Sequence, residues 1–218
     1  MEGHPFGTRC PACMGETRVI LHRDLIDEPN PAHVTEANRK LRQMPHYPED
    51  SATLAVLLDN IRSAWNVGSI LRSADGFGFT HAYLCGITPT GDNETVMKTS
   101  LGAEEAVPWS YHKDGVKLVK GLKKEGWKIF ALENDDRAMS LESGSLMLKV
   151  QEHALASLQA PLLQILIVGN EVTGVDPELL DLCDKIFYIP MRGEKKSFNV
   201  AIAFSVAAYT LSTQRSQH

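Results

Sequence analysis

Polar and charged side chains stand at three places where an apolar run of the sequence gives way to a turn that contains glycine. The first place carries Asn66 and Arg72, the second carries Glu171, and the third carries Ser197 and Asn199. None of these turns has the Gly-Lys-Ser/Thr of a phosphate-binding loop or the GxGxxG of a dinucleotide-binding turn. These residue types donate and accept hydrogen bonds and neutralise anions, so they are candidates for a ligand site.

The first place lies at a predicted helix. Residues 69–77 have the spacing of an amphipathic helix, and Asn66 stands just before it, where an N-cap residue is expected. Arg72 lies on this helix among apolar neighbours, and an arginine is seldom buried unless it has a partner. We therefore expect Arg72 to face an anion, either a carboxylate in a structural ion pair or a bound ligand.

The second place is a turn framed by glycines. An apolar run at residues 165–168 predicts a strand, and Glu171 follows it between Gly169 and Gly174. A carboxylate in this position can accept hydrogen bonds from a ligand or from a neighbouring loop, and alone it does not decide between them.

The third place follows another predicted strand, at residues 186–189. The loop 190–197 contains Gly193 beside the apolar strand end, which suits an adenine-like ring but is also compatible with an ordinary loop. Ser197 is predicted as the N-cap of the last helix, residues 198–211, and Asn199 offers a donor and an acceptor.

The elements that position these residues alternate between strand and helix. This alternation is typical of an α/β domain with a mainly parallel sheet, whose ligands bind beyond the carboxyl ends of adjacent strands. Further strands are predicted at residues 53–58, 80–85, 107–111 and 127–132, and further helices at residues 93–101 and 113–125. We interpret the lysines of residues 113–125 as a solvated outer face.

Composition narrows the class of protein. The chain has 218 residues, 43% hydrophobic residues and a formal net charge of −5, values that suit one globular domain with extensions. The negative charge argues against coating of nucleic acid through global charge, although a local basic patch remains compatible with it. No run reaches the roughly 18 apolar residues of a membrane span, and the start of the sequence lacks signal-peptide features, so we expect a cytoplasmic protein without a membrane partner.

The ends of the predicted domain are less regular. We expect residues 1–50 to form a partly ordered extension, with a short helix at residues 32–43. Cys10 and Cys13 form a lone CxxC, which favours plain thiols over a zinc site because no second pair follows. No metal site is therefore expected. Residues 139–160 allow one helix, around residues 148–158.

Taken together, the three places resemble the motifs of a known family. The first reads Asn-x-Gly-x-x-x-Arg, the second Gly-x-Glu-x-x-Gly, and the third Ile-Pro-Met-x-Gly-x-x-x-Ser-Phe-Asn-Val, at residues 66–72, 169–174 and 189–200. Their order and spacing resemble those of the SpoU/TrmH family of RNA 2′-O-methyltransferases in the SPOUT superfamily. The one departure in the third motif is Phe198, where the family usually has leucine. The resemblance covers residues 53–212.

The resemblance implies a fold and an assembly. Residues 51–218 would form a parallel-sheet SPOUT domain whose C-terminal segment is tied in a deep trefoil knot, and two copies would form a homodimer with the active site near the subunit interface. The domain would transfer a methyl group from S-adenosylmethionine to a ribose 2′-hydroxyl of tRNA or rRNA, with no role for DNA. A non-catalytic RNA-binding or ribosome-assembly homologue is the alternative, disfavoured because the polar motif residues are all present.

The resemblance also implies residue roles. The residues carried over as catalytic are Arg72, Asn66, Glu171, Ser197 and Asn199. The residues carried over as cofactor-binding are Leu132, Gly169, Ile189, Met191, Gly193, Ser197 and Phe198. Basic residues in or beside the motifs are expected to contact RNA, namely Arg62, Arg72, Arg192, Lys195 and Lys196. Because arginine stays protonated in proteins, we expect Arg72 to stabilise an alkoxide or a phosphate and not to act as a base.

Overall fold

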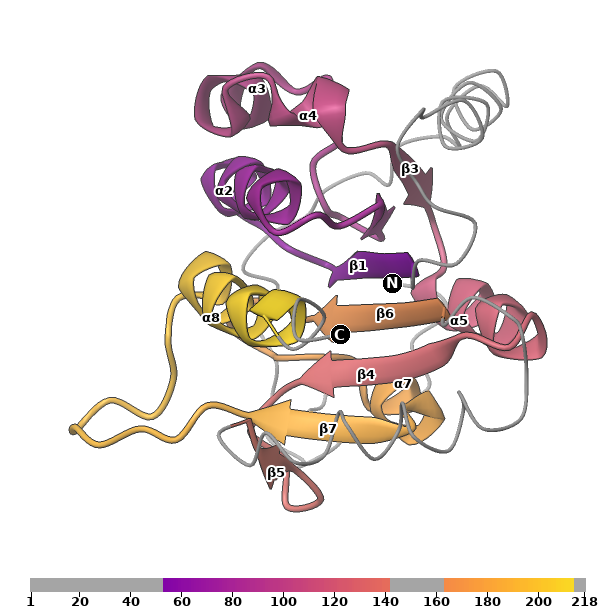
Figure 1. The fold of residues 1–218 in the computed structure, drawn as a ribbon, viewed down its shortest axis with the longest axis vertical. Coiled ribbons are helices and arrows are strands. Elements are labelled where there is room, and N and C mark those ends of the chain that lie inside the picture. Colours follow the sequence, from indigo (N-terminus) through magenta and orange to yellow (C-terminus); the bar gives the residue numbers. More distant parts are fainter. Residues whose placement is uncertain (1–52, 142–162, 214–218) are drawn as a thin grey trace, which may run out of the picture.

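The structure is a computed structural model that describes residues 53–141 and 163–213. The predicted helix at residues 32–43, the Cys10 and Cys13 pair and the helix predicted around residues 148–158 lie outside the described residues. Figure 1 shows the described chain as an open sheet with helices packed on it.

The described residues form a seven-stranded sheet in which all neighbouring strands run parallel. The parallel α/β fold predicted from the alternation of elements is therefore confirmed. The strands in spatial order are β3 (Trp109–His112), β2 (His81–Cys85), β1 (Thr53–Asp59), β6 (Leu163–Val168), β4 (Lys128–Leu132), β7 (Lys185–Tyr188) and β5 (Met139–Ser140). Because β1 and β6 are neighbours although far apart in sequence, the chain reverses its direction of winding at the centre of the sheet.

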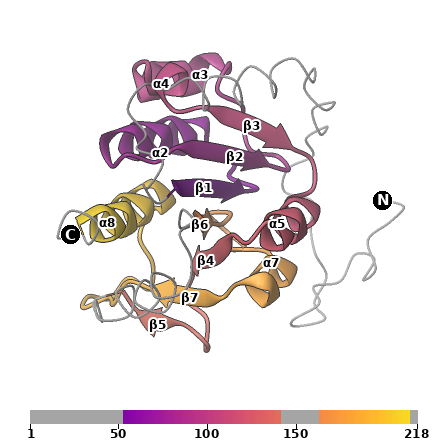
Figure 2. The same cartoon turned by 45° about the vertical axis from the view of Figure 1, so that its right-hand side comes forward.

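Both faces of the sheet are buried, as expected for parallel strands. Along β1, Leu54, Val56 and Leu58 belong to one apolar cluster, while Ala55 and Leu57 belong to the other. Figure 2 shows α2 (Ala64–Gly76) and α8 (Val200–Thr213) on one face, and α5 (Gly115–Lys124) and α7 (Pro177–Leu182) on the other. Two further helices, α3 (Glu94–Ser100) and α4 (Ala103–Ala106), pack beside α2.

The start of α2 differs from the prediction. The helix begins at Ala64, and its N-cap is Ser63, whose Oγ accepts a hydrogen bond from the backbone N–H of Asn66 at 3.4 Å. Asn66 is therefore inside the first turn, and the prediction that it is the N-cap was wrong. The apolar periodicity missed this turn because Trp65 within it is 61% exposed.

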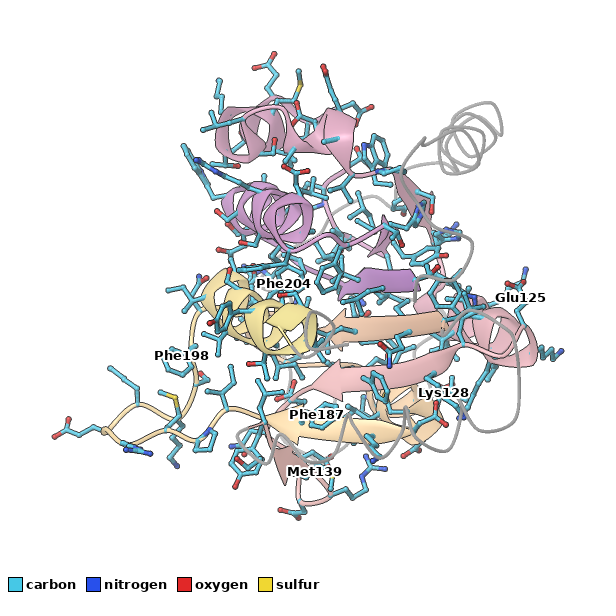
Figure 3. The ribbon with its side chains drawn as sticks, viewed as in Figure 1. Glu125, Lys128, Met139, Phe187, Phe198 and Phe204 are labelled. Carbon is cyan, nitrogen blue, oxygen red and sulfur yellow. The ribbon has the colours of Figure 1, made fainter. Side chains whose placement is uncertain are left out.

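The start of α8 also differs from the prediction. The Oδ1 atom of Asn199 accepts hydrogen bonds from the N–H groups of Ala201 at 2.9 Å and Ile202 at 3.4 Å. Asn199 therefore caps the helix, and the prediction of Ser197 as N-cap was wrong. In Figure 3, the Phe204 side chain lies between α8 and the sheet, where it is fully buried. None of the helices in the described ranges is long and apolar enough to span a bilayer.

Candidate active site

A pocket of about 660 Å³ lies beyond the carboxyl ends of β4, β6 and β7. Its walls come from residues 132–134 after β4, from residues 168–174 after β6, and from the segment 188–203, which includes the long loop before α8. Figure 1 shows that loop extending away from the body of the domain. The size and position are those expected of a small-molecule site in an open α/β sheet.

The residues predicted to bind a cofactor all line this pocket. They are Leu132, Gly169, Ile189, Met191, Gly193, Ser197 and Phe198. The pocket also contains residues that the sequence analysis did not single out, including Glu133, Asn134, Tyr188 and Glu194. Glu133 and Asn134 follow directly after a buried strand, so the rule that ligands bind at strand ends was the signal that could have identified them.

The bend after β6 is held in one shape by its own hydrogen bonds. Asn170 and Gly174 exchange two backbone hydrogen bonds of 3.0 and 2.9 Å. Gly174 has a φ of +74°, and a Cβ atom there would lie 2.4 Å from Oε2 of Glu133. The same Oε2 accepts a 2.9 Å hydrogen bond from the N–H of Val175. The positive φ favours glycine at position 174, and any larger residue would also have to displace the Glu133 carboxylate from its bond to Val175.

Glu171, at the tip of this bend, holds the start of α2. Its carboxylate accepts hydrogen bonds from the backbone N–H groups of Arg62 at 2.9 Å and Ser63 at 3.1 Å, and from the side-chain amide of Asn66 at 2.9 Å. Partial burial raises the pKa of Glu171, but the hydrogen bonds outweigh it, and the net effect is a pKa below the ordinary value. Glu171 is therefore an ionised acceptor at neutral pH.

The network continues from Asn66 to the third motif. The side-chain amide of Asn199 donates a 3.1 Å hydrogen bond to Oδ1 of Asn66, while Oδ1 of Asn199 caps α8. One polar residue from each motif thus belongs to a connected chain, Glu171–Asn66–Asn199, next to the pocket. Ser197 is exposed on the pocket wall.

Arg72 is not part of this network. It is exposed on α2, it does not line the pocket, and no described residue forms a hydrogen bond or ion pair with it. The helix geometry explains its position. Successive residues of an α-helix are rotated by about 100° around the axis, so Arg72, six residues after Asn66, lies roughly 240° around α2 from it. In the single chain, Glu171 and Asn66 hold the first turn of α2, and the role of Arg72 in the reaction stays a prediction.

The basic residues expected to contact RNA are divided between the pocket and its surroundings. Lys195 and Lys196 are exposed on the pocket wall, and Arg192 is exposed in the same loop. Arg62 is half-buried and gives its backbone N–H to Glu171. Within the described ranges, no group of three or more histidine, cysteine or acidic side chains is arranged to hold a metal ion.

Solved structures share this fold. The SpoU methyltransferase AviRb from Streptomyces viridochromogenes, in complex with AdoMet, superposes with a TM-score of 0.65 at 23% identity, covering 82% of this chain and 65% of that one. The TrmH/SpoU tRNA modifying enzyme from A. aeolicus superposes with a TM-score of 0.64 at 22% identity, covering 85% of both chains. At this identity the likeness establishes the fold.

Sequence relatives extend the comparison. The chain is 28% identical over 180 residues to the 23S rRNA (guanosine(2553)-2′-O)-methyltransferase RlmP of Bacillus subtilis, covering 81% of this chain and 66% of the relative. It is 29% identical over 162 residues to the tRNA (guanosine(18)-2′-O)-methyltransferase of Thermus thermophilus, covering 74% and 75%. It spans only 59% of the length of a third relative, the 23S rRNA (guanosine-2′-O-)-methyltransferase RlmB of Xanthomonas axonopodis pv. citri. The family model of the SpoU rRNA Methylase family matches residues 53–209, so the chain belongs to that family.

Proposed function

We propose that this chain is an S-adenosylmethionine-dependent methyltransferase that modifies the ribose 2′-hydroxyl of tRNA or rRNA in the cytoplasm. One observation carries the proposal: the second and third motifs line a single pocket, and the Glu171–Asn66–Asn199 network joins them to the first motif. Relatives that are named as 2′-O-methyltransferases of 23S rRNA and of tRNA support it.

The residues of the pocket fit S-adenosylmethionine. Leu132, Val168, Ile189 and Phe198 provide apolar surface for an adenine ring, and backbone groups beyond the strand ends are placed to hydrogen-bond its edge. Glu133 and Asn134 add polar side chains at the end of β4. When bound, S-adenosylmethionine supplies a methyl group activated by a sulfonium.

The protein must then position the ribose hydroxyl and favour its deprotonation. The O–H bond breaks, its proton passes to an RNA phosphate or to solvent, and the oxygen carries a developing negative charge. A guanidinium is suited to stabilise that charge or to hold the adjacent phosphate, because it remains protonated and donates several hydrogen bonds. We assign this role to Arg72. Ser197 and the Asn66–Asn199 pair would position the ribose, and Lys195, Lys196, Arg192 and Arg62 would attract the RNA backbone.

The assignment of Arg72 requires a second subunit. Arg72 does not line the pocket of its own chain, so we propose a homodimer in which α2 of one subunit faces the pocket of its partner. Support comes from the exposed apolar side chains on α8, where Ile202 is 54% exposed and Tyr209 is 59% exposed, and from Trp65 at the start of α2. A face of this kind is typical of a protein–protein interface.

The C-terminal path is the remaining part of the proposal. After β7, which lies next to the edge strand β5, the chain forms the 189–199 loop and returns as α8 against α2. We propose that this return passes through a loop of the chain as a deep trefoil knot, as the three motifs imply.

Binding and transfer are tested in two steps. Calorimetric titration with S-adenosylmethionine should show binding to the wild-type protein, and weaker binding after Ile189→Asp, which places a charge on the apolar wall. Transfer of labelled methyl groups to bulk tRNA or rRNA should follow. Binding without transfer to either RNA would contradict the catalytic assignment and favour a non-catalytic homologue.

A further inference from the structure

A second hollow, distant in sequence from the motifs, lies between α5 and α7. It has a volume of about 590 Å³ and is lined by Lys117, Lys120 and Lys124 together with Asp114, Val116, Gly121 and Glu178. We call this hollow the α5 groove. The three lysines are spaced i, i+3 and i+7, so they lie on one face of α5 and extend over about 10 Å along its axis. All three are exposed, and Lys113 is exposed just before the helix.

The lysines of the α5 groove lack ionic partners in the described part of the chain. The ion pairs among the described residues join Lys98 to Glu94 and Arg137 to Asp135 and Asp181, and none involves these lysines. Asp114 is the N-cap of α5, and its Oδ1 accepts a 2.9 Å hydrogen bond from the N–H of Lys117. Like charges three and four residues apart disfavour a helix, so this arrangement works against the stability of α5.

Gly121 forms the floor of the groove among these lysines. It lies four residues after Lys117 and three before Lys124, in the interior of α5. A Cβ atom at position 121 would have no heavy atom within 4 Å, and its φ is not positive, so neither packing nor backbone conformation requires glycine there. Glycine is among the least favourable residues in a helix interior. Two unfavourable features therefore coincide on one face of α5.

We propose that the α5 groove binds phosphate groups of the RNA backbone, outside the catalytic pocket. This inference rests on the proposed function for the identity of the polyanion. Lysine ammonium groups are standard phosphate ligands, and absence of a side chain at Gly121 lets a phosphate approach closely. The formal net charge of −5 gives the chain no global attraction for RNA, so attraction must come from local clusters.

The position of the groove relative to the pocket is compatible with one RNA molecule reaching both. Glu178 of the groove lies in the first turn of α7, which begins directly after the bend that lines the pocket. In Figure 3, Glu125 and Lys128, which follow α5, lie on the side of the molecule away from Phe198. The end of α5 therefore lies on the opposite side of the molecule from the loop that carries Phe198, and an RNA bound at both the groove and the pocket would extend across the domain.

Paired charge variants test the proposal. Lys117→Gln with Lys120→Gln removes two charges from the groove, and Lys98→Gln with Lys185→Gln removes two charges that lie on other elements and do not line it. Filter binding of bulk tRNA and rRNA fragments is measured between about 50 and 200 mM salt, with S-adenosylmethionine affinity as a check of the pocket. The groove variant should bind RNA on the order of tenfold more weakly, with a salt slope lower by roughly 1.5, since each lost phosphate contact lowers the slope by about 0.7–0.9.

The control pair should change RNA affinity less than about twofold, and S-adenosylmethionine affinity should stay the same in all variants. Equal effects of the two pairs, or no RNA binding by the wild-type protein, would overturn the proposal. If the groove pair selectively lowers the salt slope while methyl transfer is absent, the groove assignment stands and the enzyme assignment fails.

Gly121→Gln provides a second test that separates binding from folding. Glutamine is a good helix former without charge, so this variant should raise Tm while weakening RNA binding several-fold. A higher Tm with unchanged RNA affinity would contradict a phosphate site over Gly121.

Discussion

The side-chain amide of Asn66 donates a 2.9 Å hydrogen bond to the carboxylate of Glu171, although 105 residues separate the two positions. This bond connects the first turn of α2 to the bend that lines the pocket. The same carboxylate accepts two backbone N–H groups of the α2 entry, so the position of α2 depends on the charge and shape of one side chain. The pocket wall and the start of α2 are therefore held together by the same side chain.

Glu171→Gln should lower both stability and activity. An amide has one acceptor oxygen, so N–H donors of the α2 entry lose their partner, at a cost of about 1–3 kcal/mol. We expect a lower Tm and a loss of methyl transfer on the order of 100-fold, since Asn66 is released. Glu105→Gln on the exposed surface of α4 is the matched control. Equal Tm and turnover in the two variants would contradict a holding role for Glu171.

The pH dependence of this effect has a defined sign. The folded-state pKa of Glu171 lies below its ordinary value of 4.5, so its stabilising contribution is complete above pH 4.5 and is lost as pH falls below that value. Glu171→Gln cannot titrate at this position, so its Tm should fall less between pH 5 and pH 3 than the Tm of the wild-type protein.

Gly174→Ala should distort the pocket. The added methyl carbon would meet the Glu133 carboxylate at 2.4 Å, and the φ of +74° disfavours any residue with a Cβ. We expect destabilisation of roughly 1–3 kcal/mol and weaker binding of S-adenosylmethionine. Gly76→Ala is the control, because a Cβ at the end of α2 would meet nothing within 4 Å. A normal affinity in Gly174→Ala would show that the bend does not shape the cofactor site.

Arg72→Lys should abolish most turnover with little change in Tm. Arg72 is exposed and has no hydrogen bond or ion pair with a described residue, so lysine preserves the fold and the charge but loses the planar fork of donors. We expect a loss on the order of 100-fold in kcat with S-adenosylmethionine binding unchanged. Near-normal turnover would contradict a catalytic role.

Mixing subunits tests whether Arg72 acts across the proposed dimer. Arg72→Lys and Ile189→Asp homodimers should each be inactive, whereas a mixed dimer places a wild-type Arg72 opposite a wild-type cofactor pocket and should regain about half the activity of one wild-type dimer. No recovery after confirmed subunit exchange would favour action within one chain.

A buried histidine predicts a second pH effect. His81 is buried between β2 and β3, its Nε2 lies 2.8 Å from Oγ of Ser110, and its Nδ1 has no partner among the described residues. Burial, and then the nearby His112, lowers the pKa of His81 to about 3. The unfolded chain therefore binds a proton at this histidine below pH 6.5, whereas the folded chain does not. The free energy of unfolding falls as a result, by about 2 kcal/mol between pH 7 and pH 5. His81→Gln cannot titrate and should flatten the unfolding free energy between pH 7 and pH 5; an unchanged slope would contradict this origin.

The positions of most strands of the sheet could be predicted from the sequence. β1, β2, β4, β6 and β7 are short apolar runs bounded by turn residues, and such runs mark buried strands whatever surrounds them. The helix starts were less predictable, because Ser63 and Asn199 act as caps through single side-chain contacts that periodicity does not reveal. The same periodicity missed the first turn of α2, where Trp65 is exposed.

The candidate site was predictable in part for similar reasons. The strand-end glycines identified the pocket walls, since carboxyl ends of parallel strands meet at one edge. The partners of Glu171 and Glu133 were not predictable, because hydrogen bonds between loops more than 40 residues apart depend on the assembled fold. Arg72 was placed correctly on the helix, and its catalytic role stays a prediction, because Arg72 lies roughly 240° around α2 from Asn66 and does not line the pocket of its own chain.

The position of the transferred methyl group decides whether this chain methylates a ribose 2′-hydroxyl. The wild-type protein is incubated with labelled S-adenosylmethionine and bulk tRNA or rRNA, and the RNA is hydrolysed in alkali, which cleaves next to a free 2′-hydroxyl only. If the proposed function is right, the label appears in alkali-resistant dinucleotides that contain a 2′-O-methylribose, and Arg72→Lys yields no such label. Label recovered on a base, or no label in either RNA despite S-adenosylmethionine binding, would contradict it.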